Sequence, residues 1–225
     1  MAAVAVIASF LVPMLITVSV EPFLLAMAAP FVVGLLVMRR WVRVGIVWLG
    51  VVSLAVLLFS APFLVDALGH PESLVDFLPL VVFSIASLIG AIAAVPAFRS
   101  LHDEPSDAAR TVAIVGAAAI LVASGVALVA FAGVESVGAQ PGDTLLVAKD
   151  IKFQPEAIEA AAGIVSVHVT NEDNTRHTFT IKELGVDLSV PPGSEQRVTF
   201  DAEPGTYAFI CRPHSPDMIG ELVVG

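Results

Sequence analysis

The stretch TYAFICRPHSPDM, residues 206–218, decides how the C-terminal part of this chain is interpreted. It begins with an apolar, strand-like run and continues into Cys211, His214 and Met218, spaced as C-x-x-H-x-x-x-M. Far upstream, His177 opens a second apolar run. A thiolate and two imidazoles hold copper in a trigonal plane, with a thioether further away on the axis. The four residues therefore predict a copper site, assembled from one loop and one distant strand.

Taken one at a time, these residues have simpler explanations. A lone methionine or cysteine is usually buried for packing, and His177 alone could be a surface residue. Cys211 is the only cysteine, so it cannot form an internal disulfide. Taken together, the four residues favour copper, with zinc or an empty site as alternatives. The ligand set argues against zinc, which prefers four strong ligands.

From Thr144 onward the pattern is that of strands. Residues 164–170 alternate, with Val165, Val167 and Val169 on one face, so His168 should point away from the core. Similar short runs are 178–181, 196–200, 206–210 and 221–224. Proline and glycine separate them, which is typical of a small β-sandwich.

Several motifs in this part belong together. They are Ile151-Lys152-Phe153-x-Pro155, Ala162-Gly163, Val169-Thr170-Asn171, His177-Thr178-Phe179, Pro192-Gly193, Pro204-Gly205-Thr206-Tyr207, Cys211 through Met218, Gly220 and Leu222-Val223-Val224. With them, residues 143–225 resemble the plastocyanin/azurin-like cupredoxins. The resemblance implies a Greek-key β-sandwich and one type 1 (blue copper) site bound by His177, Cys211, His214 and Met218. It also implies electron transfer, with the edge of His214 as the exit for electrons and an apolar rim of Pro213, Pro216 and Ile219 around it.

The part before residue 135 reads as a membrane protein. Of the whole chain, 57% is hydrophobic and only 14% is charged, against about 25% charged in soluble domains. The apolar stretches long enough to cross a bilayer predict an α-helical bundle of about five spans, at 2–20, 22–38, 44–65, 74–98 and 111–134. The first two would turn at Glu21-Pro22. A cleaved signal peptide is the competing interpretation of the first span, but the basic n-region of such peptides is missing.

The charges of the loops predict the orientation. Two loops carry arginine: Arg39, Arg40 and Arg43 precede the third span, and Arg99 and Arg110 flank the loop before the fifth. The loop between the third and fourth spans has acidic residues and no lysine or arginine. Because basic loops stay in the cytoplasm, residues 136–225 are expected outside. The expected organisation is a membrane region over 1–135, a linker over 136–143 and a copper domain over 144–225.

The net charge limits the partners. The chain carries −10, and from Asp143 onward it has thirteen acidic and six basic residues. Nucleic-acid binding needs a basic face, so the sequence argues against it. A basic redox protein is a permitted partner.

We therefore expect an integral membrane protein with an extracytoplasmic blue-copper domain that carries single electrons and is not an enzyme. Multicopper oxidases and copper nitrite reductases need further histidine clusters, and a binuclear copper centre of the oxidase subunit II kind needs two cysteines. Two alternatives remain. One is copper binding, storage or delivery, which uses the same ligands. The other is an extracytoplasmic sensor or assembly domain.

Overall fold

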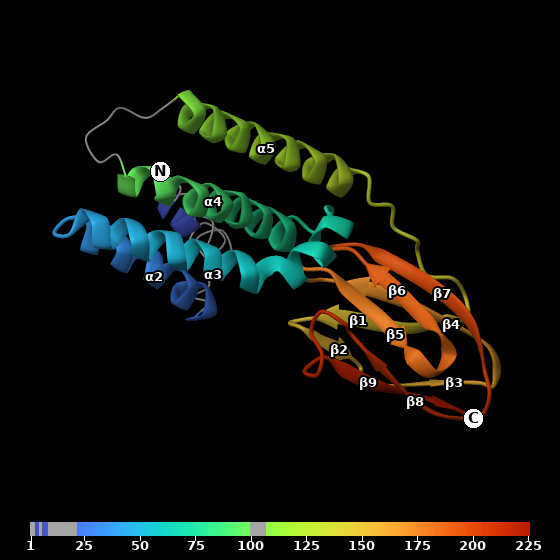
Figure 1. Cartoon of the computed structure of the whole chain (residues 1–225). Coiled ribbons are helices and arrows are strands. Elements are labelled where there is room, and N and C mark those ends of the chain that lie inside the picture. Colours follow the sequence, from blue (N-terminus) through green and yellow to red (C-terminus); the bar gives the residue numbers. More distant parts are fainter. Residues whose placement is uncertain (1–2, 5, 9–21, 100–106) are drawn as a thin grey trace. The chain divides into compact units, whose positions relative to one another are not determined.

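The computed structural model describes residues 3–4, 6–8, 22–99 and 107–225. The chain divides into two compact units, Met1–Leu128 and Val129–Gly225. The first unit contains helices and the second contains strands (Figure 1). The predicted boundaries of the membrane region, linker and copper domain remain predictions.

The helical unit has fewer certain spans than the sequence predicts. Its helices are α2 (Pro22–Met38), α3 (Val42–Gly69), α4 (Leu74–Arg99) and α5 (Asp107–Ala132). Among the described residues, α3, α4 and the 110–132 part of α5 are long and apolar enough to cross a membrane. Helix α2 has 17 residues, at the lower end of the range that crosses a bilayer core, and its apolar part is shorter than the other three. Most of the first predicted span, and Glu21, lie outside the described residues. Three membrane-capable helices, rather than five clear spans, are therefore supported.

Helices α2 and α3 pack closely at a small residue. A Cβ on Gly34 would come within 2.8 Å of the Trp48 ring and even closer to Leu49. The Trp48 indole N–H donates to the carbonyl of Pro30 at 2.9 Å, across the same contact. Many large apolar side chains point outward instead, such as Val65 (76% exposed) and Leu121 (74% exposed). Such apolar helix surfaces suit lipid better than water.

The second unit is a β-sandwich, as predicted. Its strands are β1 (Thr144–Lys149), β2 (Lys152–Gln154), β3 (Ala157–Ala160), β4 (Gly163–Asn171), β5 (His177–Ile181), β6 (Val186–Val190), β7 (Glu195–Ala202), β8 (Gly205–Ile210) and β9 (Ile219–Val224). One sheet has the order β2-β1-β4-β7 and the other β3-β9-β8-β5-β6. Pairs β1·β4 and β3·β9 are parallel, and the other pairs are antiparallel. All five predicted strand runs are present.

The sandwich core is built around three phenylalanines. The Phe209 ring contacts those of both Phe153 and Phe179, with ring centroids 5.0 Å away in each case. All three are essentially fully buried. The alternation of β4 sends Val165, Val167 and Val169 into the same core. Burying this apolar surface on both sheets is what fixes the strands that carry the candidate site.

His168 has an environment that alternation alone does not predict. It lies on the face of β4 opposite the core, as expected, but it is 4% exposed. The segment before β1 covers it. His168 Nε2 lies 3.0 Å from the carbonyl of Val137, and the Val137 N–H donates to the carbonyl of Glu195 at 2.8 Å. The predicted linker is thus hydrogen-bonded along β7.

Candidate metal centre

The loop between β8 and β9 carries three of the four predicted ligands. Strands β8 and β9 are antiparallel neighbours, with Ile210 opposite Ile219. The N–H of Cys211 donates to the carbonyl of Met218 at 3.0 Å, which closes the loop at its base. Inside it, the N–H of His214 donates to the Cys211 carbonyl, and the N–H of Met218 donates to the His214 carbonyl. These bonds fold eight residues into a compact turn that brings Cys211 and His214 together.

The fourth predicted ligand, His177, lies on the neighbouring strand. His177 is the first residue of β5, which lies beside β8 in the sheet. Two hydrogen bonds join the start of β5 to the loop: the N–H of Thr178 donates to Cys211 Sγ at 3.4 Å, and the N–H of Arg212 donates to Thr178 Oγ1 at 2.9 Å. Residues 34 positions apart in the chain therefore meet.

The ligand atoms form one tight cluster. Cys211 Sγ lies 3.5 Å from His177 Nδ1 and 3.4 Å from His214 Nδ1, and the three ligand atoms all lie within 4.8 Å of one another. Bonds to a first-row ion such as zinc are about 2.3 Å to sulfur and 2.0 Å to nitrogen, so such ligand atoms lie at most about 4.3 Å apart. Both sulfur–nitrogen distances satisfy this limit, so Cys211 could share one ion with either histidine.

The four predicted ligands differ in how much of each side chain is exposed to solvent. His177, Cys211 and Met218 are completely buried, whereas His214 is half-buried. Met218 is also part of the apolar core. Solvent or a partner protein can thus reach the site most directly at His214.

Burial also affects the cysteine thiol. It raises the pKa of Cys211, and this effect outweighs the opposing hydrogen bonds from the backbone of Thr178 and His214. A metal that binds the thiolate must therefore displace a firmly held proton.

A carboxylate that the sequence analysis did not single out contacts the ring of His177. Asp173 Oδ2 lies 2.8 Å from His177 Nε2, the ring nitrogen that faces away from Cys211. Burial alone would raise the pKa of Asp173. Hydrogen bonds from the backbone N–H groups of Ile151 and Asp150 and from His177 together lower this pKa by more than burial raises it, so the net shift is downward. The only sequence signal is an acidic residue four positions before His177, which by itself predicts nothing about contact.

Asn171 shapes the loop that carries Asp173. It is 1% exposed, and its amide donates to the carbonyls of Thr175, Val190 and Pro191 at 2.9–3.1 Å. Its Oδ1 accepts the N–H of Asp173 at 2.9 Å. The side chain therefore ties the loop before β5 to the end of β6.

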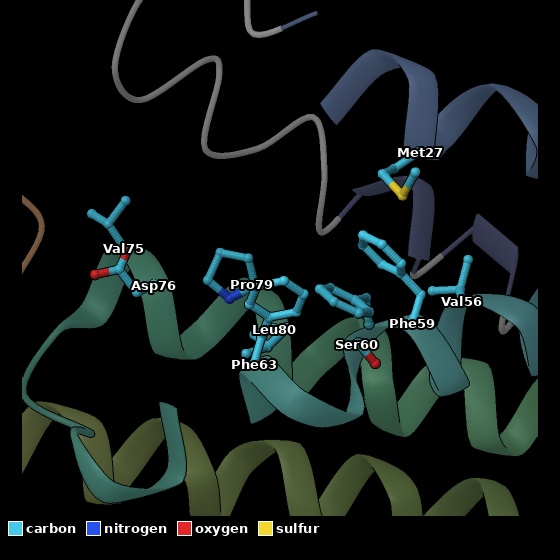
Figure 2. Close-up of a pocket in the computed structure, with 10 residues that line it drawn as sticks. Met27, Val56, Phe59, Ser60, Phe63, Val75, Asp76, Pro79 and Leu80 are labelled. Atoms are coloured by element: carbon cyan, nitrogen blue, oxygen red, sulfur yellow. The ribbon is translucent and has the colours of Figure 1, made fainter. Parts of the chain in front are cut away.

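The helical unit contains a pocket of another kind (Figure 2). Helices α2, α3 and α4 line it, chiefly with phenylalanine and aliphatic side chains, and of the lining residues only Ser60 and Asp76 have polar side chains. The Asp76 carboxylate accepts a hydrogen bond from Ser73. The pocket lacks a cluster of ligands or nucleophiles among these residues, so the centre in the β-sandwich is the candidate functional site.

The match to a protein-family model agrees with this choice. Residues 118–224 match the family model described as a cupredoxin-like domain. Among solved structures, the chain is similar to the reduced Cu(I) form of a mutant of amicyanin, at 22% identity over 39% of this chain and 86% of the other, with a TM-score of 0.32. It is also similar to the metal binding domain of the Cu(I)-exporting P-type ATPase CopA of Streptococcus pneumoniae D39, at 17% identity over 40% and 93% of the chains, with a TM-score of 0.34. A third is the copper-containing nitrite reductase of Thermus scotoductus SA-01, at 28% identity over 42% and 25%, with a TM-score of 0.32.

Proposed function

We propose that this chain, whose C-terminal part is a cupredoxin-like domain, holds one type 1 copper ion and carries single electrons at the outer face of a membrane. The observation that carries the proposal is the position of Cys211 Sγ, 3.4–3.5 Å from the Nδ1 atoms of His214 and His177. The thiolate and imidazoles suit copper, and Met218 supplies a thioether for the axis. When bound, copper supplies a reversible change between Cu(I) and Cu(II).

The hydrogen bonds around the ligands support a carrier that keeps its metal. An electron carrier needs ligands that hardly move between two oxidation states. Here the loop is closed by the Cys211–Met218 backbone bond and is held to β5 through Thr178. Both strands rest on the phenylalanine core. A rigid frame of this kind fixes ligand geometry whatever the charge at the centre.

The surroundings of His214 support exchange with a partner. Its ring is half-buried, in contrast to the fully buried ring of His177. Ile219, next to the loop, is 54% exposed, and Pro213 and Pro216 are exposed beside it. We expect this small apolar rim to dock a redox protein briefly, with the acidic character of the domain favouring a basic partner.

The helices supply the membrane attachment in this proposal. Three of them are apolar and long enough to span, and the arginine-bearing loops would lie in the cytoplasm. The cupredoxin-like domain is then extracytoplasmic, where soluble electron carriers can reach it.

The first test is the visible spectrum of the full-length protein in detergent. With copper(II) added, we expect one copper per chain and a strong blue thiolate-to-copper absorption. Cys211→Ser should abolish the colour, because the sulfur donor is lost. His168→Gln is the matched control: it changes another buried histidine of the same domain and should stay blue. A blue Cys211→Ser variant would remove this cysteine from the site.

The second test separates an electron carrier from a copper-delivery protein. The reduced, copper-loaded protein is mixed with a Cu(I) chelator of moderate affinity, and copper release is followed. We expect slow release together with fast electron exchange with a soluble carrier. Rapid release with poor electron exchange would make copper delivery the better assignment.

A further inference from the structure

The imidazole of His177 is held at both ends. Its Nδ1 lies 3.5 Å from Cys211 Sγ, and its Nε2 lies 2.8 Å from the carboxylate of Asp173. A neutral imidazole carries one N–H, and donation from Nε2 to a carboxylate leaves the Nδ1 lone pair facing the cysteine. Histidine ligands of metals commonly have such a partner, which sets the tautomer and makes the ligand more basic.

Asp173 is itself held in place by backbone donors. Its Oδ1 accepts the N–H of Asp150 at 2.8 Å, and its Oδ2 accepts the N–H of Ile151 at 3.0 Å. Asp150 and Ile151 have φ values of 54° and 57°, in the left-handed region. That conformation is unfavourable for residues other than glycine, most clearly for a β-branched one such as Ile151. The turn between β1 and β2 thus adopts a costly shape in which two successive N–H groups meet one carboxylate.

We infer that Asp173 is a positioning residue of the copper site: it orients His177, and its negative charge favours Cu(II) over Cu(I) and so lowers the reduction potential. The inference rests on the proposed function. Asp173 is well suited to the second task, because its side chain is only 16% exposed and the ring it contacts is fully buried. In such surroundings water screens a charge much less than at the surface.

The hydrogen-bond pattern shows which substitution removes the charge and keeps the contact with His177. Oδ2 accepts from both Ile151 and His177, whereas Oδ1 accepts from Asp150. In Asp173→Asn, an amide oxygen at the Oδ2 position keeps the first two bonds. The variant loses the negative charge and the bond to Asp150. His177 therefore stays oriented while its partner becomes neutral.

The experiment compares the copper affinities and the potential of the full-length variants in detergent. For Asp173→Asn we expect the affinity for Cu(II) to fall about 10- to 100-fold, with a smaller change for Cu(I). A tenfold change in the ratio of the two affinities corresponds to a potential about 59 mV higher. Glu172→Gln is the matched control. Glu172 is next in the chain but 45% exposed and paired with Lys149 at 2.7 Å, so we expect its removal to change the ratio less than about twofold.

Two further variants separate positioning from stability of the turn. Asp173→Asn should destabilise the β1–β2 turn, because it loses the bond from Asp150. Adding Ile151→Gly should restore the stability of that turn, because glycine adopts a positive φ freely. The reduction potential of the copper site should stay raised. In the metal-free protein, nitrogen-15 spectra of His177 should show a single tautomer with the proton on Nε2. Asp173→Ala should give a mixture of tautomers.

The outcomes distinguish this inference from the proposed function. If the wild-type protein binds no copper, the proposed function falls and the inference with it. If the wild type is blue and cycles reversibly, but Asp173→Asn has the same affinity ratio and potential, only the inference is overturned. Asp173 would then merely stabilise the β1–β2 turn.

Discussion

Gly220 is the position at which a single added methyl group should disturb the sandwich most. It lies in β9 opposite Phe209. A Cβ there would overlap the Phe209 ring and would lie 2.5 Å from the backbone carbonyl of Glu156. The ring cannot easily retreat, because it is fully buried and both Phe153 and Phe179 pack against it.

The expected cost of Gly220→Ala follows from this geometry. Overpacking a dense core costs about 1–3 kcal/mol, and contact with a backbone atom as well as a side chain makes relief harder. A loss of about 2 kcal/mol corresponds to a roughly 30-fold larger open population of the sandwich. The Glu156 carbonyl also accepts the N–H of Glu221 at 2.9 Å, so the displacement should extend along β9.

Amide hydrogen exchange of the full-length protein in detergent measures this cost locally. The slowest amides of β8 and β9 should exchange about 30-fold faster in Gly220→Ala, while those of α3 and α4 keep their rates. Gly138→Ala is the matched control, because a Cβ there meets nothing within 4 Å and the φ value is not in the left-handed range. Wild-type exchange rates in Gly220→Ala would refute the pairing of Gly220 with Phe209 and the tight packing argued from it.

Three further predictions concern the site, the pH dependence and the orientation. Met218→Leu conserves buried volume and should keep copper, but removal of a weak axial donor should favour Cu(I) about tenfold, a rise of about 59 mV; an unchanged potential would place Met218 outside the site. Asp143 forms an ion pair with Arg197 at 2.9 Å, and the hydrogen bond from Arg197 lowers its pKa below the ordinary value. The ionised carboxylate therefore stabilises the fold above about pH 4, and this contribution is lost as the pH falls through the lowered pKa. The difference in free energy of unfolding between wild type and Asp143→Asn should shrink in that range, and a difference that persists in acid would contradict this. A reporter fused after Gly225 should be active only outside the cytoplasm; activity only in the cytoplasm would reverse the proposed orientation.

Local patterns in the sequence were sufficient for much of the architecture. Apolar length predicted the three membrane-capable helices within a few residues, and alternation predicted the strands 164–170, 178–181, 196–200, 206–210 and 221–224. Strands β1, β2, β3 and β6 were not among the predicted runs. Three of these four strands have only three to five residues, which gives too little periodicity. Three of the predicted spans correspond to membrane-capable helices among the described residues, and the other two remain predictions.

Only part of the candidate metal site could likewise be predicted from the sequence. The types of residue and the spacing from Cys211 to Met218 were visible in the sequence, because one loop contains them. The sequence contained no measure of the distance from His177 to Cys211, which depends on β5 lying beside β8. The cover over His168 and the contact of Asp173 with His177 were equally invisible.

By itself, then, the amino-acid sequence determined which segments are apolar helices, where five of the strands lie and which residue types could hold a metal. These properties depend on neighbours within a few positions along the chain. The tertiary structure alone decided that the imidazoles of His177 and His214 lie beside the thiol of Cys211, and that the carboxylate of Asp173 contacts the other nitrogen of His177. Those contacts join residues brought together by the order of strands in the sheet and by a turn in an unfavourable conformation, which only burial of the shared core can enforce.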